Sequence, residues 1–170
     1  FLPFEKILRH VGLKNITNNY QSYSRGKKRN IIEINKFNFS LKLLPLICYE
    51  IIYSGKIFKN ADFDFIINIS EDGWFGKSVG PQQHFVHSIY RAIENGKYVL
   101  RSANNGITAI INPLGVVEKQ VDLYKSGYVD FIESRKIKPT LFLQYGNKIF
   151  GFIILLYIFL IFSVKKRKNE

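Results

Sequence analysis

Hydrophobic residues along this chain fall in short runs that are typical of strands, separated by polar turns. Runs at residues 31–39 and 40–48 predict two neighbouring strands that pair antiparallel. An apolar run bounded by polar residues at 63–70 predicts a buried strand. The pattern predicts further strands at residues 98–102, 107–111, 116–121 and 128–132.

Two helices are predicted between these strands. Residues 50–59 suit a helix that leaves the second strand. Pro81 and Gly96 mark the beginning and end of another helix, which carries one apolar face: Phe85, Ile89, Ala92 and Ile93. A short helix is predicted from Glu5, and a polar, basic loop over residues 13–30. Together these elements predict an α/β fold with mixed strand connections.

The most apolar segment lies near the C-terminus, where residues 149–164 contain no charged side chain. A membrane-spanning helix needs about 20 mostly apolar residues, and Lys148 at its edge can extend to the interface. The basic cluster over residues 165–168 is typical of a cytoplasmic flank. We therefore predict a transmembrane helix with its C-terminal end inside. A buried core helix is less consistent with a run that is apolar on every face.

We therefore predict four parts in the chain. The first is a domain at residues 1–138, and a linker follows at 139–148. The core of the membrane helix lies at 149–164, and a basic cytoplasmic tail lies at 165–170. The domain then lies on the outer face of the membrane. The chain begins with Phe1 and contains no methionine, so we expect it to be part of a longer protein.

The net charge of +12 is compatible with binding to nucleic acid or to an anionic membrane surface. The basic residues do not gather in one helix or ribbon, which disfavours nucleic acid. The chain has one cysteine, Cys48, which excludes an internal disulfide and a Cys-rich zinc site.

Cys48 is the first candidate for chemistry, because it ends an apolar strand and Glu50 follows two residues later. An inert cysteine that packs as a small hydrophobe is the alternative. Polar and aromatic side chains also follow the next two predicted strands: Glu71, Asp72, Trp74, Arg101, Ser102, Asn104 and Asn105. Since ligands of α/β sheets bind at strand ends, we expect these loops to meet over one site.

Other readings of the polar residues are weaker. Gly76, Lys77 and Ser78 suggest a phosphate-binding loop, but Glu71 stands where its first glycine is required. His84 and His87 lack an acidic third ligand at helical spacing, so surface or capping roles are expected and no metal is predicted. A dyad of Cys48 with either histidine stays open, and so does a core-filling role for Trp74.

Four motifs in fixed order make the chain resemble the bacterial apolipoprotein N-acyltransferases, which are membrane-bound members of the nitrilase (carbon–nitrogen hydrolase) superfamily. They are ICYEI at 47–51, DGWFGKS at 72–78, GPQQHF at 80–85 and RSANNGIT at 101–108. The resemblance implies an αββα sandwich, of which this chain holds part, and a Glu-Lys-Cys triad. It implies no cofactor.

The resemblance also implies roles for single residues. Cys48 would be the nucleophile and Glu50 an essential acidic residue beside it. We expect the substrate site to be lined by Tyr49, Trp74, Phe75, Arg101, Ser102, Asn104 and Asn105, with Trp74 on a loop that gates or lines the lipid pocket. The family's glutamate and lysine precede the position equivalent to Phe1, so no residue is assigned to them. We therefore expect this chain to be inactive alone.

The implied reaction moves a phospholipid acyl chain, through a cysteine thioester, to the α-amino group of a diacylglyceryl-cysteine apolipoprotein. The implied place is the bacterial cytoplasmic membrane, with the domain on its periplasmic face. Two other functions stay open at this point. One is a membrane-anchored amidase or nitrilase that uses water as acceptor, and the other is a membrane-tethered binding module without catalysis.

Overall fold

A computed structural model describes residues 30–36, 39–55, 62–132 and 137–168 of the chain. The helix predicted from Glu5 lies outside the described residues. So does the basic loop predicted at residues 13–30, apart from its last residue.

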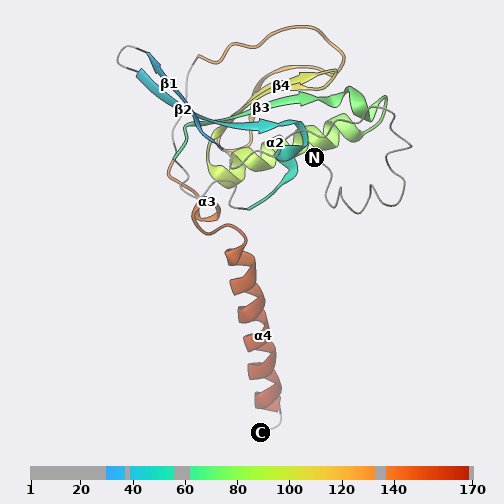
Figure 1. The fold of residues 1–170 in the computed structure, drawn as a ribbon. Coiled ribbons are helices and arrows are strands. Elements are labelled where there is room, and N and C mark those ends of the chain that lie inside the picture. Colours follow the sequence, from blue (N-terminus) through green and yellow to red (C-terminus); the bar gives the residue numbers. More distant parts are fainter. Residues whose placement is uncertain (1–29, 37–38, 56–61, 133–136, 169–170) are drawn as a thin grey trace, which may run out of the picture.

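The described residues form one six-stranded mixed sheet whose strands lie in chain order (Figure 1). The strands are β1 (Ile32–Lys36), β2 (Phe39–Ile47), β3 (Phe65–Glu71), β4 (Tyr98–Asn104), β5 (Thr108–Ile111) and β6 (Val117–Val121). The strands β2, β3 and β4 run parallel, whereas β1, β5 and β6 are antiparallel to their neighbours. The predicted antiparallel pair β1–β2 and the mixed α/β sheet are thus confirmed.

The strand predicted at residues 128–132 is wrong. These residues carry no strand assignment and follow β6 as an irregular segment. Their apolar side chains still pack, because Val129 and Phe131 lie against a cluster of Leu43, Phe65, Tyr98 and Ile110. The alternation that suggested a strand therefore reflects one-sided packing against the sheet without ladder hydrogen bonds.

The long helix α2 (Gly80–Asn95) connects β3 to β4, as predicted. A proline occupies its first turn, and Gly96 ends it in the left-handed conformation with a φ of 61°. The prediction of a helix at residues 50–59 is wrong for those of its residues that the structure describes. The chain forms the short 3₁₀ helix η2 (Cys48–Ile52) instead, and residues 56–61 lie outside the described part.

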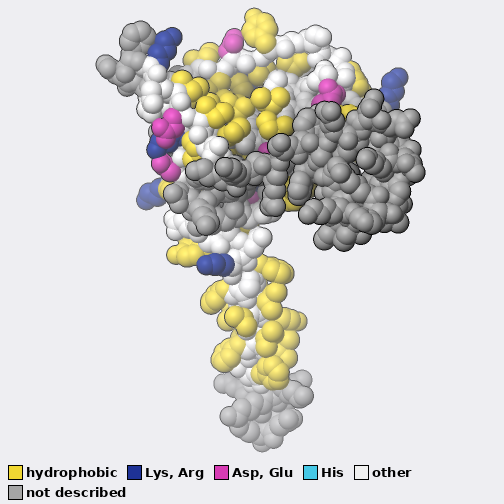
Figure 2. All heavy atoms as spheres, in the orientation of Figure 1, with side chains coloured by type: hydrophobic (Ala, Val, Ile, Leu, Met, Phe, Trp, Pro, Cys, Tyr) yellow, Lys and Arg dark blue, Asp and Glu magenta, His cyan; other side chains and the backbone are white. Residues whose placement is uncertain are grey.

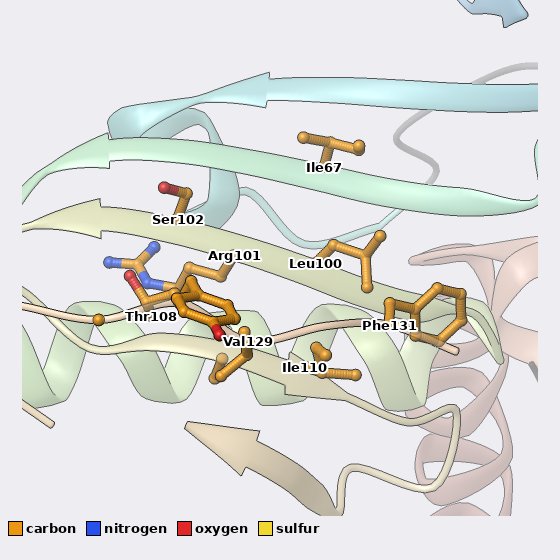
Figure 3. A pocket seen from close by; sticks show the side chains of 11 residues that line it. Ile67, Leu100, Arg101, Ser102, Thr108, Ile110, Val129 and Phe131 are labelled. Carbon is orange, nitrogen blue, oxygen red and sulfur yellow. The ribbon is translucent and has the colours of Figure 1, made fainter. Parts of the chain in front are cut away.

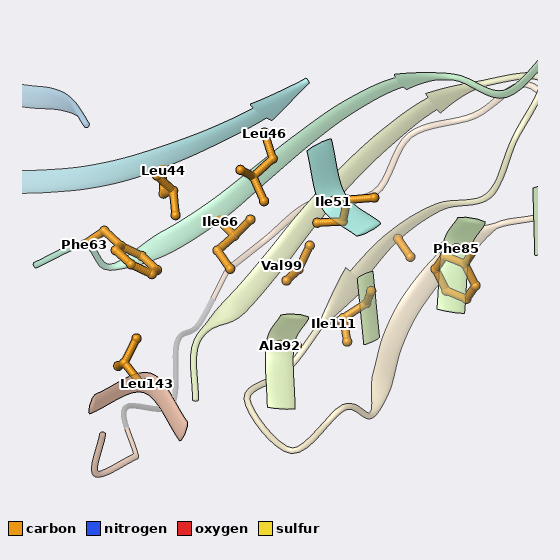
Figure 4. Packing of buried hydrophobic residues seen from close by; sticks show 11 residues of the cluster. Leu44, Leu46, Ile51, Phe63, Ile66, Phe85, Ala92, Val99, Ile111 and Leu143 are labelled. Carbon is orange, nitrogen blue, oxygen red and sulfur yellow. The ribbon is translucent and has the colours of Figure 1, made fainter. Parts of the chain in front are cut away.

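The main hydrophobic core lies between the sheet and α2 (Figure 4). Alternate strand residues point toward the helix, which is why Leu44, Ile66 and Val99 are fully buried there. The helix contributes Phe85 and Ala92. Ile93, which was predicted on the same face, is exposed.

The described residues cover the opposite face of the sheet only in part. Ile47 and Ile69 point to this face and are 57% and 56% exposed. A second sheet, which the sandwich architecture requires, remains a prediction.

The C-terminal part begins with the short helix α3 (Leu141–Tyr145), inside the segment predicted as a linker. It continues as α4 (Lys148–Lys168), which extends away from the sheet (Figure 1). Hydrophobic side chains cover the visible surface of α4 (Figure 2). Within the described parts of the chain, no helix is both long and apolar enough to cross a membrane.

We predict that Ile66→Ala lowers the free energy of unfolding by about 2–5 kcal/mol, because it removes a fully buried side chain from the core under α2. The matched control is Ile69→Ala in the same strand. It should cost less than about 1 kcal/mol, since Ile69 is largely exposed. Urea unfolding of both variants measures the difference, and equal losses would contradict the assignment of faces.

Candidate active site

The carboxyl ends of the parallel strands β2, β3 and β4 lie at one edge of the sheet. Cys48 follows β2, Asp72 follows β3, and Asn104 ends β4 opposite Glu71. The three loops thus lie at the same edge of the sheet, and the prediction that they form one site stays a prediction.

Cys48 lies on a sharp turn between β2 and η2. Its φ of 47° is in the left-handed region, which L-residues other than Asn and Asp rarely adopt and which costs about 1–3 kcal/mol. The Asn68 side-chain amide donates to the carbonyl oxygens of Leu46 at 2.8 Å and Cys48 at 3.3 Å. On the other side, the Glu50 carboxylate accepts from the backbone N–H of Ile47 at 2.8 Å. These contacts hold the turn and leave the cysteine side chain half-buried at the sheet edge.

Asp72 forms the centre of a buried polar network beside this turn, and its side chain has no solvent exposure. Oδ1 accepts from Ser70 Oγ at 2.6 Å and from His84 Nδ1 at 2.8 Å. Oδ2 accepts from the Arg101 guanidinium at 2.6 Å. Both carboxylate oxygens are thus hydrogen-bonded, and one of their partners carries a full positive charge.

Arg101 extends this network toward Cys48. Its guanidinium is fully buried and donates to Asn68 Oδ1, to Ser88 Oγ at 3.5 Å and, through Nε, to the Ile107 carbonyl at 3.2 Å. Asn68 in turn holds the carbonyl of Cys48. The ion pair is therefore connected to the backbone of the cysteine through one side chain.

Burial and the neighbouring charges shift the pKa values of Asp72 and Arg101. Burial opposes ionisation of Asp72 and is the largest single effect on it. The hydrogen bonds from His84 and Ser70 and the charge of Arg101 together outweigh burial and hold the pKa of Asp72 below its usual value. Burial likewise lowers the pKa of Arg101, while Asp72 opposes that change, and an arginine remains charged at any physiological pH.

His84 is buried within the network, so the prediction of a surface or capping role for it is wrong. An ionised carboxylate only accepts hydrogen bonds, so Nδ1 must carry the proton that faces Asp72. Nε2 is buried without a hydrogen-bond partner among the described residues. The ring lies between those of Tyr49 and Phe75, with centroid distances of 5.7 and 5.4 Å.

No metal centre is apparent at this edge, because the described part of the chain has no group of three potential metal-binding side chains. The alternative of a metal-binding pair formed by His84 and His87 gains no support. Instead, Asp72 is the partner of His84, and it was not among the ligands considered at helical spacing.

A second buried arginine fixes the far end of η2. Arg91 Nη1 donates to the carbonyls of Ile51 and Ile52 at 3.3 and 3.0 Å, and Nη2 pairs with Glu94 at 2.7 Å. These contacts satisfy carbonyl groups that a short helix leaves free at its end. They explain why the helix predicted over residues 50–59 stops after one turn.

The remaining predicted site residues are mostly exposed at the same edge. Trp74 lies on the short helix η3 (Asp72–Phe75) and is 87% exposed, so the core-filling alternative for it is wrong. Tyr49 is 55% exposed, and Phe75 is half-buried. Ser102, Asn104 and Asn105 are exposed at the end of β4, whereas Arg101 points into the buried network.

Glu71, for which the sequence suggested no clear role, supports η3. Its carboxylate accepts from the Gly73 N–H at 2.8 Å and from the Asn104 side chain at 2.5 Å. It therefore connects the loop that carries Trp74 to the end of β4.

A separate cavity of about 330 Å³ lies on the sheet face away from α2 (Figure 3). Its apolar lining includes Ile67, Leu100, Ile110, Val129 and Phe131. Two predicted site residues, Arg101 and Ser102, also line this cavity, whereas Cys48 and Asp72 do not.

Sequence reasoning missed three members of the network, Asn68, Ser70 and Ser88, and gave His84 other roles. A signal for two of them exists, since Asn68 and Ser70 alternate with apolar residues in a strand predicted as buried. Polar side chains at such positions require buried partners. Asn68 is bonded to Arg101, 33 residues away along the chain, and Ser70 contacts Cys48, 22 residues away, so these pairings follow only from the fold.

Comparisons with known proteins find similar sequences over most of this chain. The model of the carbon–nitrogen hydrolase family matches residues 7–130. An apolipoprotein N-acyltransferase of Rickettsia bellii is 44% identical over 151 residues, which cover 88% of this chain and 29% of the relative. An apolipoprotein N-acyltransferase of Rhizobium leguminosarum bv. trifolii is 37% identical over 131 residues, with 76% and 24% coverage. The chain thus spans less than a third of the length of these curated relatives.

Among solved structures, an amidase from Nesterenkonia sp. AN1 aligns with a TM-score of 0.45 and 13% sequence identity. The aligned part covers 59% of this chain and 41% of the amidase.

We predict that Asp72→Asn destabilises the fold by about 3–5 kcal/mol near neutral pH, because it leaves Arg101 buried without its counter-charge. The lowered pKa of Asp72 means that its carboxylate stabilises the fold fully above pH 3.8, the unfolded value, and that this stabilisation is lost as the pH falls through the lower folded value. The difference in the free energy of unfolding between wild type and Asp72→Asn should therefore become smaller below pH 3.8. Urea unfolding between pH 2.5 and 7 measures it.

The control for this prediction is Asp122→Asn. Asp122 also has a lowered pKa through its hydrogen bond with Lys125, but that pair lies at the surface. Solvent screens such a pair, so its loss should change stability little at any pH. Equal losses of unfolding free energy in the two variants would contradict the importance of the buried Asp72–Arg101 ion pair for stability.

Proposed function

This chain belongs to the carbon–nitrogen hydrolase family, and we propose that the protein is an apolipoprotein N-acyltransferase. In this proposal it moves a fatty acyl chain from a phospholipid to the N-terminal α-amino group of a diacylglyceryl-cysteine apolipoprotein. The observation that carries the proposal is the position of Cys48, a half-buried thiol on a strained turn where the ends of three parallel strands meet. The names of the similar proteins supply the reaction class.

In the first half-reaction, the Cys48 thiolate attacks the carbonyl carbon of an acyl ester in the phospholipid. A carbon–sulfur bond forms, and the ester bond breaks in the tetrahedral intermediate. The electron pair leaves with the glycerol oxygen, which takes up one proton to give a lysophospholipid. The acyl chain is then held as a thioester on Cys48.

In the second half-reaction, the free α-amino group attacks the thioester carbonyl. A carbon–nitrogen bond forms, the carbon–sulfur bond breaks, and the electron pair returns to Cys48 as thiolate. The amine loses one proton and becomes an amide. A thioester suits an exchange of two lipid substrates, because it is more reactive toward an amine than the ester from which it was made.

Glu50 is proposed as the acidic residue that keeps the nucleophile in place. Its carboxylate accepts from the N–H of Ile47, next to Cys48, and so supports the strained turn from the side opposite Asn68. No residue of this chain is proposed as the base that takes the thiol proton.

The exposed residues at the sheet edge are proposed to contact the two lipid substrates. Tyr49, Trp74 and Phe75 provide aromatic surface beside Cys48, which suits an acyl chain and its glycerol end. Ser102, Asn104 and Asn105 provide hydroxyl and amide groups for the polar parts of a lipid. Arg101 is proposed to act from behind this surface, through Asn68 and Asp72.

We also propose that α4 anchors the protein in a bacterial cytoplasmic membrane, with the sheet on the periplasmic side and the C-terminus in the cytoplasm. The apolar side chains between Phe150 and Val164 are 41–67% exposed, so the described residues leave this helix surface largely open. Such a surface is unfavourable in water and favourable in lipid. The basic residues at 165–168 support the orientation.

The membrane proposal predicts that the protein stays in the pellet when membranes are extracted with alkaline carbonate. In a protein limited to residues 1–170, replacement of two α4 residues, Ile154→Lys and Ile158→Lys, should release it, because each charge is costly in the bilayer centre. Release of the wild-type protein by carbonate alone would contradict an anchor.

The enzymatic proposal predicts that Cys48→Ser lowers acyl transfer by more than about a thousandfold in membranes that contain the intact protein, because a serine hydroxyl is a far weaker nucleophile than a thiolate. Mass spectrometry of a reporter lipoprotein, before and after incubation, measures the added N-terminal acyl chain. An unchanged melting temperature of the variant would show that the loss is chemical.

The same assay separates the alternatives. Release of free fatty acid or ammonia without acylation of the amine would indicate a hydrolase that uses water. Full transfer by the Cys48→Ser variant would exclude Cys48 as the nucleophile.

A further inference from the structure

We propose that Ser70 is a positioning residue for the sulfur of Cys48, and that its one hydroxyl proton alternates between the Asp72 carboxylate and the Cys48 thiolate. This inference rests on the proposed role of Cys48 as nucleophile. It adds a residue that lies outside the four motifs through which the chain resembles its relatives.

The geometry places Ser70 between the two acceptors. Ser70 is buried near the end of β3, and its Oγ lies 2.6 Å from Asp72 Oδ1 and 3.6 Å from Cys48 Sγ. The longer distance is appropriate for a hydrogen bond to sulfur, whose radius is larger than that of oxygen. Both contacts are thus within hydrogen-bond reach of one oxygen atom.

A hydroxyl group has one proton and can rotate, so Ser70 cannot donate to both acceptors at once. While Cys48 is a thiol, its S–H donates to Ser70 Oγ and Ser70 donates to Asp72. When the thiol has lost its proton, the sulfur only accepts. The hydroxyl then turns and donates to the thiolate, and no covalent bond changes at Ser70.

Asp72 tolerates the loss of this donor because two others remain. Oδ1 keeps the hydrogen bond from His84 at 2.8 Å, and Oδ2 keeps the ion pair with Arg101 at 2.6 Å. The thiolate, by contrast, gains a buried donor at the moment when it becomes charged, and hydrogen bonds to charged groups are the stronger ones. Once the sulfur carries an acyl group it is neutral, and Ser70 returns to Asp72.

Other charged groups also act on the sulfur. Arg101 on β4 interacts electrostatically with Cys48, Asp72 on η3 and His84 on α2 are bonded to each other in the same network, and Glu50 lies on the turn that carries the sulfur. The pH at which Cys48 becomes reactive therefore reflects all of them. Only a change confined to the Ser70 hydroxyl isolates its contribution.

The test compares Ser70→Ala with wild type in the intact, membrane-embedded protein. The rate of Cys48 alkylation by iodoacetamide is measured from pH 5 to 10 by mass spectrometry of the Cys48 peptide. Without the hydroxyl, the pH of half-maximal rate should rise by about one unit, and the rate at pH 7 should fall about five- to tenfold. A purely structural role would not move this midpoint.

Two further variants make the result specific. Ser88→Ala also removes a buried hydroxyl from the network, but Ser88 accepts from Arg101 and is not bonded to Cys48, so the midpoint should stay within about 0.3 units of wild type. Ser70→Thr keeps a hydroxyl at the same place and should keep the wild-type midpoint. Melting temperatures show whether each variant is folded.

The outcomes are distinct. A reactive Cys48 whose midpoint is unmoved in Ser70→Ala overturns the role of Ser70 and leaves the proposed function intact. An equal shift in Ser88→Ala overturns it as well, because the effect would then belong to the network as a whole. If Ser70→Ala does not fold, a shifted midpoint in Ser70→Thr decides against the proposal. A Cys48 that is inert at every pH in wild type contradicts the proposed function itself.

Discussion

The ion pair between Asp72 and Arg101 is the interaction on which the sheet edge depends. Both side chains are fully withdrawn from water, where an unpaired charge would cost several kcal/mol. The pair is tolerated because Asp72 has further donors in Ser70 and His84, and Arg101 has further acceptors in Asn68 and Ser88. These groups come from β3, β4, η3 and α2. One buried charge pair therefore joins four elements at the place where β2 presents Cys48.

This arrangement connects stability to the proposed chemistry. Cys48 holds a backbone conformation that is unfavourable by about 1–3 kcal/mol, and such a conformation persists only if its surroundings fix it. Asn68 donates to the carbonyl of Cys48, and Glu50 accepts from the N–H of Ile47. Arg91 donates to the carbonyl of Ile52 at the end of η2. Cys48 stays half-buried, and the exposed Tyr49 follows it directly in the sequence. A rigid frame thus carries a thiol at the edge where the lipid substrates are proposed to bind.

The sequence predicted much of this fold because its signals are local. Short apolar runs indicated the strands, and Pro81 and Gly96 indicated the ends of α2. Predictions from local signals were wrong where residues far apart in the sequence determine the structure. Arg91 binds the end of η2 from 40 positions away, so the described part of the helix predicted over 50–59 is a short 3₁₀ helix. The segment 128–132 has the apolar alternation of a strand but pairs with no strand among the described residues. At the site, His84 is a buried partner of Asp72, which spacing along one helix could not indicate.

The most direct test of this account is the trapping of the acyl intermediate. The intact protein in membranes is incubated with a phospholipid of known acyl chains, without an acceptor lipoprotein, and digested for mass spectrometry. The account predicts that the peptide containing Cys48 gains the mass of one fatty acyl chain, and that neutral hydroxylamine removes it, as expected of a thioester. An acyl chain on another residue, or transfer to a lipoprotein without any adduct on Cys48, would contradict it.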